Sequence, residues 1–306
     1  MKINRRNLIF YPYSIVFSVR FTYSTIFYQV KAFIYLFVAF FVSKGSTNLF
    51  GHGDLDLRIE SATEEIKNTP DSAFLYFKRG KLYFQHEEYS KSIQDIDSAN
   101  HLGYSDKYAS MIKSQCLLRL DSFQKALNCI LPIQLENPEL TLPYKILGSI
   151  YFEMGSYEAS ALSWQDAILH SKRKIPEDYI NASNSWFQLN NHENYAKGIY
   201  ILNEGLVHFS NIHSLLIHKR DSALKFSDFE TAIAVQNTII DQSKRKEIPY
   251  FELGEIFEKA RMYELALEHY IKSKNAVEKL PSHIRSNKSM RILEDSLFQK
   301  INQEKN

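Results

Sequence analysis

The chain has 306 residues, and its 37 Lys and Arg residues nearly balance its 35 Asp and Glu residues, giving a formal net charge of +2 at pH 7. This composition gives no sign of the clustered basic surface that a nucleic-acid-binding protein requires. The two cysteines are too few for a disulfide framework or for a zinc site with four thiolates.

Residues 1–53 differ in composition from the rest of the chain. They contain six Lys or Arg residues and no acidic residue, which leaves 31 basic and 35 acidic residues in the remainder. Residues 32–42 (AFIYLFVAFFV) form an apolar and aromatic run directly after Lys31. A membrane-spanning helix needs about 20 such residues, whereas the apolar core of a secretory signal needs about 7–15. We therefore expect a cleaved signal peptide, which would place the mature protein in the periplasm or outside the cell.

Other interpretations of this leader stay open. Residues 8–42 could instead form a retained membrane anchor, and the basic residues ahead of the apolar run would then orient the rest of the chain outward. Acid-free basic leaders also occur as organellar transit peptides. If the leader is not a signal of any kind, the protein is cytoplasmic.

The folded part is predicted to begin just after the leader. Gly51, His52 and Gly53 suggest a flexible joint, and Asp54 is a candidate N-cap for a helix. This helix should run to residue 69 and end before Pro70.

From residue 73 onward a pair of short amphipathic helices recurs. Its clearest copy is residues 144–167 (YKILGSIYFEMGSYEASALSWQDA). Tyr144, Leu147, Gly148 and Tyr151 share one helix face because they are spaced i, i+3, i+4 and i+7. Gly155 then allows a turn before the second helix. Such a pair cannot bury its apolar face alone, so it needs similar pairs beside it.

The copies follow at a nearly constant spacing. An aromatic residue opens each second helix, at intervals of 34 or 38 residues: Tyr89, Phe123, Tyr157, Tyr195, Phe229 and Tyr263. The eighth position of each first helix is also recognisable, as Gly80, Ser114, Gly148, Ser183, Arg220 and Gly254.

This pattern resembles the tetratricopeptide repeat family, whose 34-residue unit contains W-x2-L-G-x2-Y. The best matches begin at Tyr144 and Tyr250 and continue through Leu147-Gly148 and Leu253-Gly254. The resemblance implies an all-α solenoid of about six helical hairpins that binds other proteins.

The repeats predict one superhelical domain over residues 54–302, in which the helix at 54–69 is a half repeat that covers the edge of the first full repeat. Full repeats are expected at 73–106, 107–140, 141–174, 176–211, 213–246 and 247–280, followed by a capping helix at 283–302. Two repeats depart from the pattern. Residues 190–194 (NNHEN) add about three residues to the fourth repeat and predict a bulged turn. In the fifth repeat, Arg220 replaces the usual Gly and Gln236 an apolar residue, which predicts looser packing.

In this family the first helices line a concave groove that binds partners. The corresponding positions give a candidate partner-binding set of Phe77, Lys81, Phe84, Gln115, Leu118, Arg119, Lys145, Phe152, Asn184 and Phe187. Members that clamp a terminal carboxylate use a Lys and an Asn four residues apart, but this chain has Phe77 and Lys81 there and no aligned Asn. The alternative is that the aromatic members of the set only pack between neighbouring first helices.

No pattern for catalysis or cofactor binding was found. The chain has no GxGxxG, P-loop or GxSxG motif. His208, His213 and His218 are five residues apart, which rotates each by about 140° from the last around a helix and prevents them from sharing one face. A metal site at His52 and a disulfide between Cys116 and Cys129 stay open.

We therefore expect a non-enzymatic scaffold that needs no cofactor or metal and whose partner is a protein or peptide. A membrane-anchored docking subunit is the first alternative, and a metal-handling protein or an enzyme on the same repeats is the second.

Overall fold

The computed structural model describes residues 49–303, which are helical apart from short connections. The chain divides into two units, Met1–Glu64 and Glu65–Asn306. The predicted signal, anchor or transit segment falls in residues 1–48, outside the described part. No helix within residues 49–303 combines the length and apolarity needed to cross a bilayer.

Helix α2 (Leu49–Asn68) begins earlier than the sequence suggests. Gly51 and Gly53 lie inside this helix, so the predicted flexible joint and the predicted N-cap at Asp54 are both wrong. A glycine in a helix interior costs only about 0.5–1 kcal/mol relative to alanine, and a continuous helix keeps the backbone hydrogen bonds formed. The position of a Cβ at Gly53 has no neighbouring atom within 4 Å.

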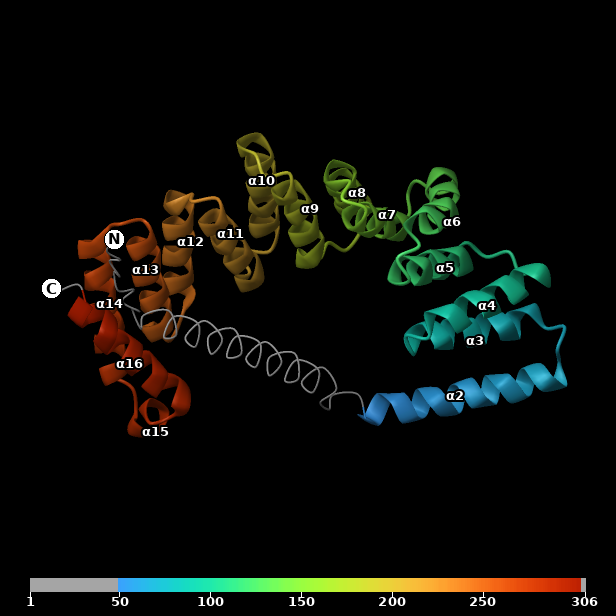
Figure 1. The fold of residues 1–306 in the computed structure, drawn as a ribbon, viewed down its shortest axis with the longest axis horizontal. Helices are drawn as coiled ribbons and strands as arrows, with labels where there is room; N and C mark the ends of the chain where they lie inside the picture. The colour runs from blue at the N-terminus through green and yellow to red at the C-terminus, as the bar shows by residue number, and fades with distance from the viewer. Residues whose placement is uncertain (1–48, 304–306) are drawn as a thin grey trace, which may run out of the picture. The chain divides into compact units, whose positions relative to one another are not determined.

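The second unit contains six helical hairpins that follow one another in chain order (Figure 1). Each hairpin packs against the next, so each first helix from α5 onward contacts its own second helix and the second helix of the preceding hairpin. The pairs are α3 (Ala73–Gln85) with α4 (Tyr89–His101), α5 (Lys107–Arg119) with α6 (Phe123–Glu136), α7 (Thr141–Glu153) with α8 (Tyr157–His170), α9 (Pro176–Gln188) with α10 (His192–His208), α11 (His213–Lys225) with α12 (Phe229–Gln242), and α13 (Glu247–Lys259) with α14 (Tyr263–Glu278). The predicted all-α solenoid of helical hairpins is confirmed.

A close approach at the eighth position of the first helix recurs in these hairpins. A Cβ at Gly148 would lie 2.6 Å from Nε1 of Trp164, and a Cβ at Gly254 would lie 2.5 Å from Cε1 of Tyr270. The hydroxyl of Ser160 donates a 2.6 Å hydrogen bond to the carbonyl of Gly148, and Ser92 does the same to Gly80 over 2.7 Å. Small residues at these positions therefore let two helix backbones pack closely.

The turn of the fourth hairpin is not bulged, so the prediction from residues 190–194 is wrong. This turn has the same three-residue length as the others, and the extra residues extend α10 by one turn ahead of Tyr195. Asn191 starts this longer helix by accepting a 2.8 Å hydrogen bond from the backbone nitrogen of Asn194. Tyr195 still contacts Phe187, with ring centroids 5.9 Å apart. The insertion thus lengthens a helix and keeps the aromatic contact of the hairpin.

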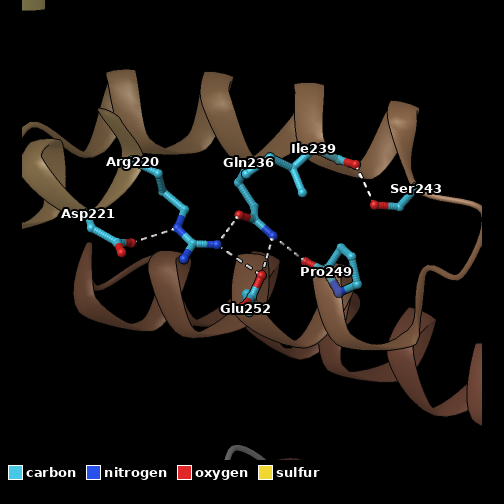
Figure 2. Close-up of polar contacts among 7 residues, drawn as sticks. All are labelled: Arg220, Asp221, Gln236, Ile239, Ser243, Pro249 and Glu252. Atoms are coloured by element: carbon cyan, nitrogen blue, oxygen red, sulfur yellow. Dashed lines mark hydrogen bonds and ion pairs between the residues drawn. The ribbon is translucent and has the colours of Figure 1, made fainter. Parts of the chain in front are cut away.

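A polar network joins the helices of the fifth hairpin at the positions where the sequence predicted looser packing (Figure 2). Nη1 of Arg220 donates to Oε1 of Gln236 and pairs with Oε2 of Glu252, each over 2.9 Å. Nε2 of Gln236 donates to the carbonyl of Pro249 over 2.8 Å. Because Gln236 is fully buried, its side chain fills the space between α11, α12 and α13.

The C-terminal segment forms two helices where the sequence predicted one. Helix α15 (Ser282–Arg285) is a single turn, and α16 (Lys288–Gln303) follows it. Asn287 separates them because its Oδ1 accepts a 2.9 Å hydrogen bond from the backbone nitrogen of Met290, which is a helix-capping contact. Met290, Leu293 and Leu297 are buried in one core cluster with residues of α13 and α14.

Candidate protein-binding site

A groove of about 900 Å³ runs along the first helices α3, α5, α7 and α9. Phe84, Leu118 and Phe152 line it and are 34 residues apart, so they occupy one position in three successive hairpins. Stacking of equivalent hairpins places equivalent side chains in a row. The groove therefore has an apolar row that results directly from the repeat.

The three residues of this apolar row are half-buried and have two roles. Phe84 contacts Tyr89 at a ring-centroid distance of 6.2 Å, and Phe152 contacts Tyr157 at 5.4 Å, so each closes the turn of its own hairpin. Their remaining surface faces the groove. Phe84 and Phe152 therefore pack within their own hairpins and also line the groove.

Polar side chains of α5, α7 and α9 line the same groove. Four of them are in the candidate set: Gln115, Arg119, Lys145 and Asn184. Nζ of Lys145 lies 2.7 Å from Oδ2 of Asp178, whose side chain is 2% exposed, so the lysine charge is matched by a buried carboxylate. Arg119 is exposed, and neither Arg119 nor Asn184 has a side-chain hydrogen bond or ion pair within residues 49–303. These two side chains can donate hydrogen bonds to a ligand.

Acidic residues border the groove at the hairpin turns, a feature that the sequence reasoning missed. Glu87 and Asp121 are the central residues of the first two turns, with φ of 62° and 54°, and Glu153 ends α7. Every hairpin turn in the described part has a residue with positive φ at this position. These turn positions recur at intervals of 34 to 37 residues, so the repeat indicates where they lie, and the sequence shows that the residue is acidic in the first two turns.

Three residues of the candidate set lie outside the groove. Phe77 is 8% exposed and stacks on Tyr104 at 4.7 Å, and Phe187 is 4% exposed within a core cluster. Phe187 can sink into the core because Gly198 faces it, where a Cβ would lie only 2.3 Å from its Cε1 atom. Lys81 is exposed, with its Nζ 5.7 Å from the ring of Tyr108. These three residues are therefore not part of the groove surface.

Cys116 and Cys129, considered for a disulfide, and the three histidines at positions 208, 213 and 218 do not line this groove. Among residues 49–303 no group of three His, Cys, Asp or Glu side chains is placed to hold a metal ion. Cys116 is buried, Cys129 is half-buried, and both are free thiols whose pKa values burial raises. Burial lowers the pKa of His218, which favours its neutral form.

Comparison with known proteins identifies the fold. No protein-family model and no curated protein sequence matches the chain. The structure is similar to that of a tetratricopeptide repeat protein from Parabacteroides merdae, with 14% identity, a TM-score of 0.51, and coverage of 85% of this chain and 95% of that one. It is also similar to the C-terminal part of a TPR repeat-containing protein from Cytophaga hutchinsonii, with 14% identity, a TM-score of 0.60, and coverage of 80% and 96%. The hairpin array thus has the tetratricopeptide repeat fold.

Proposed function

We propose that this chain is a non-enzymatic scaffold that binds a peptide or a helix of a partner protein along α3, α5, α7 and α9. The observation that carries the proposal is the row of Phe84, Leu118 and Phe152 in a groove of about 900 Å³. Apolar side chains that remain partly exposed in a groove are typical of sites for partner side chains.

The polar groups of the groove suit an extended or helical segment with several hydrogen-bonding groups. Arg119 and Asn184 can donate to carbonyl or carboxylate oxygens of the ligand. Glu87 and Asp121 at the turns can accept from lysine or arginine side chains. Because Lys145 is already paired with Asp178, it serves to position α7 against α9 more than to provide a free charge.

A selection experiment tests this function. The full chain is immobilised and used to select peptides from a random display library, and the affinity of a selected peptide is then measured by fluorescence anisotropy. The double variant Phe84→Ala/Phe152→Ala should bind it at least tenfold more weakly, since loss of one well-buried apolar anchor costs about 2 kcal/mol.

The matched control is Leu135→Ala, which removes a 72% exposed side chain from α6 outside the groove. Circular dichroism should show the same helicity for all variants. Unchanged affinity of the double variant would reject the groove as the binding site.

We also propose that the scaffold acts outside the cytoplasmic membrane, on the basis of the apolar run at residues 32–42. N-terminal sequencing of the protein purified from its native source tests this. A start between Gly45 and His52 would support release after signal cleavage. An intact Met1 in a membrane fraction would support the alternative of an anchored docking subunit, and an intact Met1 in the cytoplasm would contradict both.

A further inference from the structure

A second groove lies between the second helices α8 and α10. It has two connected parts, with volumes of about 830 and 620 Å³, which share Leu162, Gln165, Tyr200 and Ile201. Tyr179 of α9 lines the larger part. A Cβ at Gly205 would lie 3.0 Å from the Tyr179 ring, so the absence of a side chain there lets the ring pack against α10.

Four large apolar side chains in this groove are exposed. Leu162 and Leu169 on α8 are 51% and 73% exposed, and Tyr200 and Val207 on α10 are 62% and 84% exposed. Each pair is seven residues apart, which is about two helical turns, so both members point from the same helix face. Among the second helices that the structure describes, only α8 and α10 have such a pair.

The two pairs form two apolar levels. Leu162 and Tyr200 line both parts of the groove, whereas Leu169 and Val207 line only the larger part. The first two residues therefore stand at one level and the last two at another, about 10 Å further along the helices. A helix placed in the groove would meet these levels with residues that are also seven apart.

Between the two apolar levels the groove is acidic. Asp166 and Glu204 each follow the first-level residue of their helix by four positions, and neither has an ion pair within residues 49–303. Of the lysines that line the groove, Lys197 is paired with Glu193, and Lys174 donates to the carbonyl of Ile168 over 2.6 Å. Tyr200 donates a 3.2 Å hydrogen bond to Oε1 of Glu204, but no cationic side chain within residues 49–303 forms an ion pair with Asp166 or Glu204.

We infer that the groove between α8 and α10 docks an amphipathic helix of a partner protein. The helix has apolar residues seven apart for the two levels and a lysine or arginine midway between them for Asp166 and Glu204. A second copy of this chain that presented the same groove would place these carboxylates against themselves, which costs energy. The site shares no residue with the groove along the first helices, so it stands independently of the function proposed above.

Two synthetic helical peptides of about 18 residues, long enough for an isolated helix to form, test this inference. Both have leucines seven positions apart, and the residues midway are lysine in one peptide and glutamate in the other. Fluorescence anisotropy with the full chain at low salt should show at least tenfold tighter binding of the lysine peptide. Asp166→Lys/Glu204→Lys should reverse this preference.

Leu169→Ala/Val207→Ala should weaken binding of the lysine peptide at least tenfold, and the fold should persist because both side chains are exposed. Phe84→Ala/Phe152→Ala should leave this binding unchanged, which separates the two sites. Equal affinity for both peptides, or full affinity of the Leu169→Ala/Val207→Ala variant, would overturn the inference. A homodimer in sedimentation that this variant dissociates would also overturn it, because the occupant would then be a second copy.

Discussion

Arg220 donates a hydrogen bond from Nη1 to Oε1 of Gln236 over 2.9 Å, across the first and second helices of the fifth hairpin. The two residues are sixteen positions apart, as are Gly148 and Trp164 in the third hairpin and Gly254 and Tyr270 in the sixth. The same pair of positions therefore packs by shape in two hairpins and by hydrogen bonding in another. In the fifth hairpin Arg220 also forms an ion pair with Glu252 of the next hairpin, so this polar contact links two repeats.

Replacing Arg220 with alanine should lower the free energy of unfolding by about 1–3 kcal/mol. The loss follows because Oε1 of the fully buried Gln236 would lose its donor and Glu252 would lose its cation. Urea unfolding followed by circular dichroism measures it. Arg173→Ala removes an exposed arginine outside the network and should change stability by less than about 0.5 kcal/mol. Equal stabilities of the two variants would show that the network contributes nothing.

Gly148→Ala and Gly254→Ala should each destabilise the protein by about 1–3 kcal/mol. The new methyl groups would meet the rings of Trp164 and Tyr270 at about 2.6 and 2.5 Å, and such overpacking forces neighbouring side chains or backbone to shift. Gly53→Ala is the matched control, because the same change in a helix with open space is expected to be neutral or slightly stabilising. Thermal unfolding compares the three, and a stability gain at Gly148 would contradict the close approach.

Stability should fall in acid partly because of Asp228. Burial opposes the charged form of this carboxylate, but hydrogen bonds from Thr231 and Tyr195 and the nearby charge of Lys219 outweigh burial, so its pKa lies below the ordinary value of 3.8. A lowered pKa in the folded state contributes stability above the unfolded pKa, and this contribution is lost as the pH falls below about 3.8 toward the folded value.

Asp228→Asn should therefore reduce the difference in urea stability between pH 6 and pH 3. Tyr195→Phe removes the 2.7 Å hydrogen bond from the phenol but keeps the cap to Thr231, so it should reduce the difference by a smaller amount. An Asp228→Asn variant with the acid sensitivity of the wild type would disprove this role.

The fold could be predicted because the same signals recur in every repeat. The errors in the prediction lie at individual residues, whose effect on helix boundaries depends on local contacts. A spacing of 38 residues cannot distinguish a longer turn from a longer helix, and the capping side chain of Asn191 selected the helix. Likewise, a Gly-rich start at residues 51–53 suggests a joint when tertiary context is unknown, whereas α2 continues through it.

The candidate site was predictable only where the repeat fixes the position. Phe84, Leu118 and Phe152 lie in one groove because they are equivalent by the 34-residue period. Phe187 breaks this equivalence because Gly198 opens space for its ring in the core, and contact between helices of this kind cannot be read from spacing. The groove between α8 and α10 depends on exposure at Leu169 and Val207, which also requires the packed structure.

The most direct test of the central proposal is photo-crosslinking of a library-selected peptide to the full chain. The crosslinker p-benzoylphenylalanine replaces Leu118 in the middle of the apolar row or, in a second sample, the exposed Leu135 of α6. We predict that the peptide crosslinks at position 118 and not at position 135, as read by mass spectrometry. Crosslinking at position 135 without any at position 118 would contradict binding along the first helices.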